Sequence, residues 1–245
     1  MNIILFEKDE LKSECIVLTD HRAKHIAKVL HSEPGDCVRI GEIDGKIGTG
    51  KVVSIQNRYP FLVELSVSLS ARPAPPPSID LILAMPRPIM LKRILSQVTA
   101  LGIGTMYLVN ANRVEKSFWD AGILNEDEYR PHLLHGLEQA VDTRLPEIKI
   151  FRYFLPFVEE YLPDLGTQYS SCIIAHPDSP NSLSDCLKNQ DGGILYAVGP
   201  EGGWVDFEIE KFLAAGMKDF SIGSRILKVD TAAVSIHGRI SQLLG

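Results

Sequence analysis

One stretch of sequence decides the fold of this chain, Ile194-Leu195-Tyr196-Ala197-Val198-Gly199-Pro200-Glu201-Gly202-Gly203. Its first five residues are all apolar, as a strand buried on both faces of a sheet requires. The run stops at three glycines and a proline, which set sharp turns and leave room for a ligand to approach the backbone. In open α/β sheets ligands bind at the carboxyl ends of strands, so this turn is a candidate binding loop. Taken alone, it is equally well explained as a tight strand-to-helix connection.

Strands and helices alternate on both sides of this stretch. The other predicted strands are residues 79–83, 106–109, 148–151, 172–175 and 220–222. Apolar residues at helical spacing mark the helices between and after them: Leu91, Ile94, Val98 and Leu101; Tyr129, Leu133, Leu137 and Val141; Val205, Ile209, Phe212 and Leu213; Ala233, Ile236, Ile240 and Leu243. Such alternation predicts an α/β domain with a largely parallel sheet covered by helices.

A second candidate loop runs from Ser221 to Ala233. A strand is predicted to end at Gly223 and a helix to begin near Thr231. Two cations, Arg225 and Lys228, and the carboxylate of Asp230 lie between them. By themselves, Asp230 and Thr231 are best explained as helix N-caps, and the two cations as residues of a solvated loop.

Residues 1–72 have a different pattern. Short β-rich runs occur at 15–18, 37–40, 51–55 and 61–65, which predicts a small β-barrel. One helix interrupts them, from about Asp20 to Leu30, with Ile26, Val29 and Leu30 on its buried face. The proline-rich stretch 71–78 predicts a stiff connector. We therefore expect two domains, residues 1–72 and 73–245.

The composition is that of an ordinary soluble globular protein, with 45% hydrophobic and 23% charged residues. No segment predicts secretion or membrane spanning, and the four cysteines lack C-x-x-C spacing, so we expect a cytoplasmic protein without a metal site. Lys and Arg balance Asp and Glu in residues 1–72, so the net charge of −6 belongs to residues 73–245. Binding of a polyanion would therefore depend on local basic patches.

The two loops together resemble a known family. Gly-Pro-Glu-Gly-Gly at 199–203, followed by Ile-Gly-Ser-Arg-Ile-Leu-Lys-Val-Asp-Thr-Ala-Ala at 222–233, is similar to the paired motifs of the SPOUT methyltransferases. The likeness is greatest to the bacterial 16S rRNA uracil-N3 methyltransferases, whose pattern is G-P-E-G-G … L-G-x-R-I-L-R-x-E-T-A. Upstream, Glu138-Gln139 with Arg144-Leu145-Pro146-Glu147-Ile148 resembles the family's E-Q helix and R-x-P-x-I, and His25–Leu30 resembles H-x-x-R-V-L. The chain departs from the family where Lys28 and His31 replace arginines, where Arg87–Met90 replaces K-G-D-R, and where Asp230 replaces glutamate.

This resemblance implies a PUA-like β-barrel that binds RNA in residues 1–72. It implies a trefoil-knotted, dimer-forming SPOUT domain in residues 73–245. The implied cofactor is S-adenosylmethionine, and the implied partner is 16S ribosomal RNA, which we expect to be bound in the assembled small subunit. The cofactor is expected to lie bent among three loops and to contact Ala175, His176, Gly199, Pro200, Glu201, Gly202, Gly203, Ile222, Gly223, Ile226 and Leu227.

The implied reaction transfers a methyl group to uracil N3, a poor nucleophile until its imide proton leaves. We assign Asp230 as the acceptor of that proton or the group that orients it. Arg225 and Lys228 are expected to hold phosphate or to stabilise the developing uracil anion. Expected RNA contacts are Arg22, His25, Lys28 and Arg113.

Two alternatives stay open. SPOUT enzymes that methylate the ribose 2′-oxygen share the cofactor loops but lack the R-I-L-[RK]-x-[DE]-T-A arrangement. A non-catalytic RNA-binding assembly factor would have a decayed pocket, whereas the loop at 199–203 is intact.

Overall fold

The structure is a computed structural model that describes residues 1–73, 75, 78–187 and 192–244. The chain divides into two compact units, Met1–Pro75 with Leu137–Leu145, and Pro76–Gly136 with Pro146–Gly245. The expected division after residue 72 lies close to this one, and the middle of the proline-rich connector (residues 74 and 76–77) lies outside the described residues. No sequence pattern indicated that residues 137–145 join the first unit. They do so through backbone hydrogen bonds, from the Asn2 amide to the Glu138 carbonyl (2.9 Å) and from the Asp44 amide to the Thr143 carbonyl (2.7 Å).

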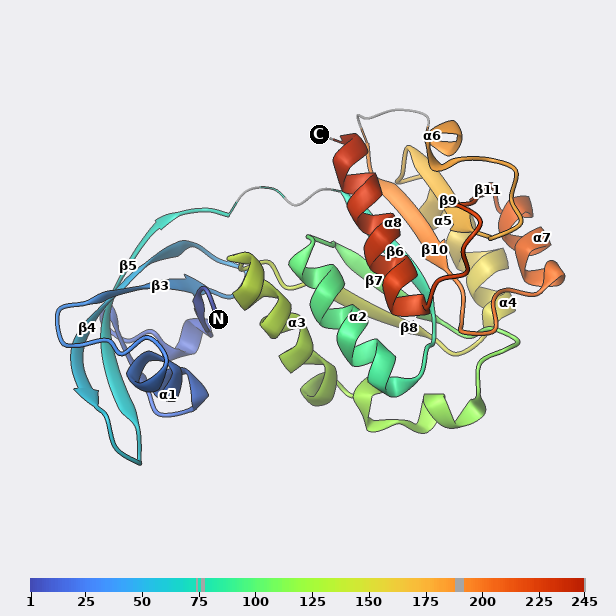
Figure 1. Cartoon of the computed structure of the whole chain (residues 1–245). Coiled ribbons are helices and arrows are strands. Elements are labelled where there is room, and N and C mark those ends of the chain that lie inside the picture. Colours follow the sequence, from blue (N-terminus) through green and yellow to red (C-terminus); the bar gives the residue numbers. More distant parts are fainter. Residues whose placement is uncertain (74, 76–77, 188–191, 245) are drawn as a thin grey trace. The chain divides into compact units, whose positions relative to one another are not determined.

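The first unit is built on a curled five-stranded sheet (Figure 1). Its strands are β1 (Ile4–Phe6), β2 (Cys15–Leu18), β3 (Cys37–Glu42), β4 (Ile47–Gln56) and β5 (Leu62–Ala71), in the order β1-β3-β4-β5-β2. Only β1 and β3 pair in parallel; the other pairs are antiparallel. Among the described residues no pairing joins the edge strands β1 and β2 of this curled sheet.

The helix α1 (His21–Lys28) packs its apolar side against this sheet. Asp20 caps it as expected, accepting the Arg22 amide at 2.8 Å, and Ile26 is fully buried. The expectation that Val29 and Leu30 are buried is wrong, because the helix ends at Lys28 and both side chains turn to solvent, 62% and 46% exposed.

Arg22 fastens α1 to the rest of the first unit. Its guanidinium donates to the Leu5 carbonyl (2.8 Å), to both carboxylate oxygens of Glu10 (2.6 and 3.0 Å) and to Asp20 (2.8 Å). These hydrogen bonds lower the pKa of Glu10; at Asp20 burial opposes the effect, yet the net pKa is also lowered. Because the Arg22 side chain is only 13% exposed, the cluster is a structural link inside the unit.

The second unit is built on a six-stranded sheet in which every pair is parallel. Its strands are β6 (Ile79–Ala84), β7 (Thr105–Val109), β8 (Glu147–Phe151), β9 (Ser171–Ala175), β10 (Ile194–Val198) and β11 (Lys218–Phe220), in the order β11-β9-β10-β6-β7-β8. The predicted α/β class and parallel sheet are confirmed. The last strand ends at Phe220, two residues before the expected end.

Helices cover both faces of this sheet (Figure 1). The helical segments are α2 (Pro88–Ala100), α3 (Glu126–Ala140), α4 (Phe154–Pro156), a π-helical turn (Phe157–Tyr161), α5 (Leu162–Gly166), α6 (Leu183–Cys186), α7 (Asp206–Ala214) and α8 (Val229–Leu244), with short 3₁₀ turns at Lys116–Asp120 and Gly122–Leu124. On one face Leu195 and Ala197 pack with Phe157 and Phe212. On the other, the Tyr196 hydroxyl lies 3.3 Å from Nδ1 of His237 in α8. The central strand β10 is therefore buried on both faces, as its apolar run predicts.

The last helix begins earlier than the sequence indicated. The helix α8 starts at Val229, so Asp230 lies inside its first turn and is not the N-cap residue expected. Ala233, Ile236 and Ile240 are buried as predicted, whereas Leu243 is 37% exposed. Over the ranges that the structure describes, we find no helix with the length and apolarity needed to cross a membrane.

The Arg22 cluster predicts an acid-sensitive first unit. Replacing Arg22 with Met in the full chain should lower its unfolding free energy at pH 7 by on the order of 2 kcal/mol, since charge-assisted hydrogen bonds are lost. Both carboxyl pKa values are lowered in the folded state, so this stabilisation is present at neutral pH and is lost as the pH falls below about 4. Denaturation followed by circular dichroism at pH 7 and pH 3.5 measures it. The control is Lys24→Met, an exposed cation of the same helix; equal effects of the two substitutions would contradict the prediction.

Candidate functional site

A cavity of about 410 Å³ opens at the carboxyl edge of the parallel sheet. Three segments form it, which follow β9, β10 and β11. It is lined by Arg113, Ala175, His176, Pro177, Asp178, Val198, Gly199, Pro200, Glu201, Gly202, Gly203, Trp204, Asp206, Phe220, Ser221, Ile222, Gly223, Arg225, Ile226, Leu227, Val229, Ala232 and Ile236. Every residue that we expected to contact the cofactor is in this set. The tertiary structure thus brings together three segments that are far apart in the sequence.

The glycine loop after β10 requires its glycines. Gly203 has a φ of +73°, and its amide donates to the Pro200 carbonyl at 2.8 Å, which closes a tight turn. A Cβ on Gly199 would lie 3.1 Å from Nε1 of Trp204, tighter than an ordinary contact. Trp204 is 5% exposed and meets Phe212 edge-on, with ring centroids 5.0 Å apart. It is a packing residue that closes the loop.

One donor in the cavity wall has no protein acceptor. The indole Nε1 of Trp204 is buried and makes no hydrogen bond within the described part of the chain. Buried donors are nearly always paired in folded proteins, so an unpaired one in a cavity wall indicates a ligand that carries an acceptor. Together with the bare glycine backbone, this favours a polar small molecule.

Side chains from neighbouring loops hold the glycine loop in place. Oε1 of Glu201 accepts the Arg87 amide at the start of α2 (3.0 Å), and the guanidinium of Arg113 donates to the Gly202 carbonyl. Arg113 therefore lies on the cavity wall; we had expected it to contact RNA. The carboxylate of Glu208, 2% exposed, accepts the amides of Asn112 (2.6 Å) and Val205 (2.9 Å). This buried carboxylate fixes the segment that carries Arg113, and the sequence analysis missed it because an acidic residue in the first turn of a helix is ordinary.

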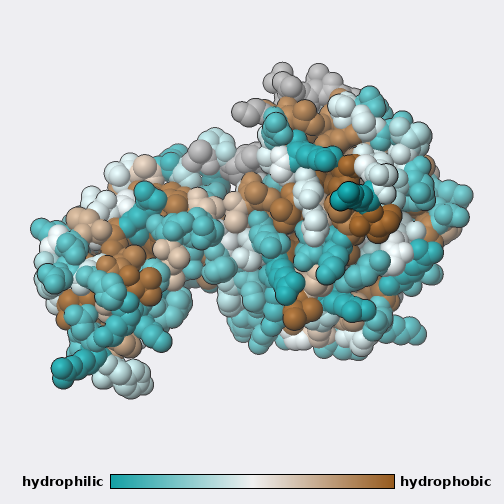
Figure 2. Space-filling model, in the orientation of Figure 1, coloured by the Kyte–Doolittle hydropathy of each residue, from teal (hydrophilic) through white to brown (hydrophobic). Residues whose placement is uncertain are grey.

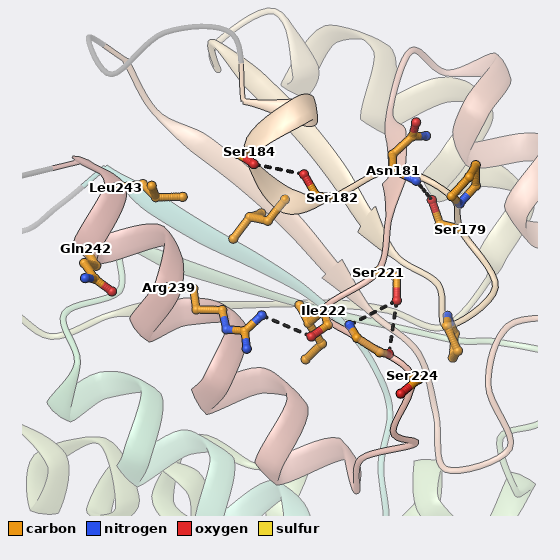
Figure 3. Close-up of a pocket in the computed structure, with 14 residues that line it drawn as sticks. Ser179, Asn181, Ser182, Ser184, Ser221, Ile222, Ser224, Arg239, Gln242 and Leu243 are labelled. Atoms are coloured by element: carbon orange, nitrogen blue, oxygen red, sulfur yellow. Dashed lines mark hydrogen bonds between the residues drawn. The ribbon is translucent and has the colours of Figure 1, made fainter.

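The third loop, Ser221–Leu227, separates this cavity from a second one. Figure 3 shows that second cavity, about 650 Å³ and open to solvent, with Arg239 of α8 reaching the loop. The guanidinium donates to the Ile222 carbonyl at 3.1 Å, and Oγ of Ser221 accepts the Gly223 amide at 3.2 Å. Ile222 lines both cavities, so these bonds set the position of a wall of the candidate cofactor site. No sequence signal marked Arg239.

The three residues assigned to the chemistry are placed differently. Arg225 is exposed and lines the cavity, whereas Lys228 and Asp230 are not among its lining residues. Oδ1 of Asp230 accepts the Thr231 amide at 2.9 Å, and Oδ2 lies 3.9 Å from the guanidinium of Arg93 in α2. Asp230 is thus half-buried beside the cavity, next to a cation that the sequence analysis did not identify.

The expected RNA contacts of the first unit are also placed differently from one another. The guanidinium of Arg22 is taken up by Glu10 and Asp20. Nε2 of His25 is buried and unpaired within the described residues, and burial lowers the pKa of this imidazole. Lys28 is exposed, with Nζ 5.8 Å from the centroid of the Phe61 ring. Of the three, Lys28 presents a charge to solvent.

Comparisons with known proteins agree with this geometry. Residues 73–241 match the model of an RNA methyltransferase domain, and residues 18–65 match that of an RNA methyltransferase PUA domain. The chain is 34% identical to a ribosomal RNA small subunit methyltransferase E of Treponema pallidum, over 95% of this chain and 88% of that protein. It is 25% identical to ribosomal RNA small subunit methyltransferase E 1 of Borreliella burgdorferi, over 96% and 95%. The fold matches a ribosomal RNA small subunit methyltransferase E of Neisseria gonorrhoeae, solved bound to S-adenosyl methionine, with a TM-score of 0.78, 19% identity and 98% of both chains covered.

The contact between Arg239 and the loop predicts a positioning role. Arg239→Ala should weaken binding of S-adenosylmethionine about tenfold, because one hydrogen bond that holds the Ile222 carbonyl is lost. Isothermal titration calorimetry measures the affinity. The control is Gln242→Ala, which removes another polar α8 side chain from the second cavity. Unchanged affinity in the Arg239 variant would show that the loop holds its position without this bond.

Proposed function

Because this chain belongs to the ribosomal RNA small subunit methyltransferase E family, we propose that it transfers a methyl group from S-adenosylmethionine to N3 of a uridine in 16S ribosomal RNA. The observation that carries the proposal is the cavity at the carboxyl edge of the sheet, whose lining includes every residue expected to contact the cofactor. Ribosomal RNA methylation follows from the family. The uridine and its N3 atom rest on the motif of residues 222–233.

The cavity suits this cofactor. Glycines at 199, 202 and 203 leave backbone open to a ligand, and the unpaired Nε1 of Trp204 offers a hydrogen bond to an acceptor such as an adenine nitrogen or a carboxylate. When bound, S-adenosylmethionine supplies an electrophilic methyl group on a sulfonium. We propose that the residues expected from the sequence (Ala175 and His176; Gly199–Gly203; Ile222, Gly223, Ile226 and Leu227) hold it.

We propose that Arg225 and Asp230 act on the uracil. Arg225 lines the cavity and is exposed, so its guanidinium is placed to stabilise negative charge that develops on the base. Asp230 accepts or orients the imide proton, and the guanidinium of Arg93 lies 3.9 Å from its Oδ2. Lys228, exposed on the same loop, contributes to holding RNA phosphate.

We also infer the finer architecture that the resemblance implies. The first unit acts as a PUA-like RNA-binding module, and Lys28 is its exposed cation among the residues first assigned to RNA. The second unit is trefoil-knotted. An experimental structure with an unknotted backbone would contradict this. The enzyme acts in the cytoplasm, where ribosomes are assembled, on the assembled small subunit.

We propose that the second unit forms a homodimer through α2 and α8. Apolar groups interrupt the hydrophilic surface on the face that carries these helices (Figure 2). Exposed apolar side chains on or directly after these helices are Ile89, Leu101 and Leu243, which are 62%, 38% and 37% exposed. Exposed apolar surface is typical of association sites.

The test of the function is methyl transfer followed by mapping. The chain and S-adenosylmethionine should methylate small subunits from a strain that lacks the corresponding gene, and the product should stop reverse transcription at one uridine, since an N3 methyl blocks base pairing. Gly202→Val should abolish transfer and cofactor binding, because its Cβ would lie 2.9 Å from Cδ of Arg113 and its branches would fill the cavity wall. Light scattering on the same preparation should give the mass of two chains. A product that pairs normally but resists alkaline cleavage would show ribose methylation, and cofactor binding without transfer would favour an assembly factor.

Asp230→Asn separates catalysis from structure. The amide keeps the size of the side chain and an acceptor for the Thr231 amide, so fold and cofactor affinity should persist. Single-turnover methyl transfer should nevertheless slow by roughly 10²–10⁴ at pH 7, the span expected when a positioned acid–base group is lost. The loss should shrink towards pH 9, where hydroxide deprotonates uracil directly. Arg225→Ala should show no comparable rescue. An Asp230→Asn enzyme as fast as the parent at pH 7 would make Asp230 a structural partner of Arg93 only.

A further inference from the structure

A third pocket lies at the same carboxyl edge of the sheet as the cofactor cavity. It encloses about 720 Å³ and is lined by Asn110, Ala111, Asn112, Val114, Lys116, Trp119, Tyr153, Phe154, Leu155, Pro156, Val205, Phe207 and Glu208. These residues follow β7 and β8 and begin α7, and we call them the aromatic pocket.

Two aromatic side chains of the aromatic pocket are largely exposed to solvent. Tyr153 is 73% exposed and Phe207 is 49% exposed, while Trp119 is 7% exposed and forms part of the floor. Leu155 beside them is 42% exposed. Aromatic faces left open to solvent are the platforms on which proteins stack unpaired nucleic-acid bases.

Cations surround these rings, although the unit as a whole is acidic. The guanidinium of Arg152 lies over the Trp119 ring at 5.7 Å. Nζ of Lys211 lies over the Phe207 ring at 5.5 Å and is paired with the carboxylate of Glu159. Lys116 lines the pocket and is exposed. The one carboxylate in the lining set, Glu208, is 2% exposed and accepts two backbone amides, so it turns no charge to the opening. The pocket therefore combines stacking surface with positive charge, which matches a polyanion that carries bases.

A polar group inside the pocket is oriented to read a base edge. Oδ1 of Asn110 accepts two hydrogen bonds, from Nε1 of Trp119 at 2.9 Å and from the Ala111 amide at 3.0 Å. These donors fix which end of the amide is oxygen. The Nδ2 donors, which make no hydrogen bond within the described residues, remain for an acceptor such as a base carbonyl.

The aromatic pocket is lined by direct chain neighbours of residues that line the cofactor cavity. Asn112 and Arg113 are neighbours in sequence and line the aromatic pocket and the cofactor cavity, respectively. Likewise, Trp204 lines the cofactor cavity and the next residue, Val205, lines the aromatic pocket. The carboxylate of Glu208 joins the two segments because it accepts the amides of Asn112 and Val205. A strand of RNA with one nucleotide in the cofactor cavity would place a neighbouring nucleotide at the aromatic pocket.

We propose that the aromatic pocket is a subsite that stacks an unpaired base of the substrate RNA close to the nucleotide that is methylated. The proposal rests on the proposed function and extends it: the substrate is RNA whose target is flanked by at least one unstacked base. The rings of Tyr153 and Phe207 supply the stacking, Lys116 and Arg152 attract the backbone, and Asn110 donates to the base edge.

The test is the RNA concentration that half-saturates single-turnover methyl transfer to small subunits. The double variant Tyr153→Ala with Phe207→Ala should raise it at least tenfold, since alanine substitution of a stacking ring costs about 1–3 kcal/mol, or roughly 5- to 150-fold. The Kd for S-adenosylmethionine and the rate at saturating RNA should not change. Tyr153→Phe and Phe207→Tyr keep the rings and should behave as the parent. Lys116→Ala should reduce the salt dependence of RNA binding by about one unit of slope.

A matched control separates stacking from loss of any exposed apolar group. Leu213→Ala removes a 41% exposed side chain from the same helix as Phe207 but outside the pocket, and it should have no effect. If the parent transfers no methyl group to ribosomal RNA, the proposed function fails. If the parent does, and the folded double variant and Phe207→Ala alone half-saturate at the parent's RNA concentration, the subsite is overturned while the function stands. In that case a protein partner becomes the better occupant of the pocket.

Discussion

The burial of β10 on both faces is the constraint on which the second unit depends. Five consecutive apolar side chains alternate between two helical layers, one containing Phe157 and Phe212 and the other containing α8. A strand in this position must have parallel neighbours on both sides, here β9 and β6. Parallel neighbours in turn bring the ends of their strands to one edge. The loops that follow β7, β8, β9, β10 and β11 therefore gather there, and both the cofactor cavity and the aromatic pocket are consequences.

Individual polar contacts then give that edge its shape. Glu208 accepts amides from the β7 loop and from the start of α7, Glu201 accepts the amide of Arg87 just before α2, and Arg239 donates to the β11 loop. Each of these bonds joins two loops that the sheet places close together, and the bond fixes their position relative to each other. Their energies are modest, about 1 to 3 kcal/mol each, yet a cavity wall displaced by an ångström loses its complementarity to a ligand. The carboxyl edge is thus positioned by the sheet and adjusted by side chains.

Local hydrogen-bond partners also explain why the residues expected to bind RNA lie in different environments. Arg22 lies beside two carboxylates in a half-buried place, where a guanidinium is held by several bonds and has little freedom to meet a phosphate. Arg113 stands on the wall of the cofactor cavity because the Gly202 carbonyl is its acceptor. The residues of the first unit were expected to contact RNA. The aromatic pocket offers such a contact surface in the second unit, although the net charge of that unit is negative. Local placement of charge, and not the total, determines where a polyanion can bind.

The sequence by itself determined the class of the second unit, the places of its strands and the loops that line the cofactor cavity. Apolar runs, glycine turns and helical spacing are local signals that need no knowledge of distant contacts. Only the tertiary structure decided which polar residues act together. Asp230 meets Arg93, Glu208 meets Asn112, and Arg239 meets Ile222, each across a separation that no periodicity encodes. It also decided that Val29 and Leu30 face solvent and that residues 137–145 join the first unit. Helix ends and hydrogen bonds between distant segments depend on the free energy of the whole packed arrangement, and a local pattern does not contain it.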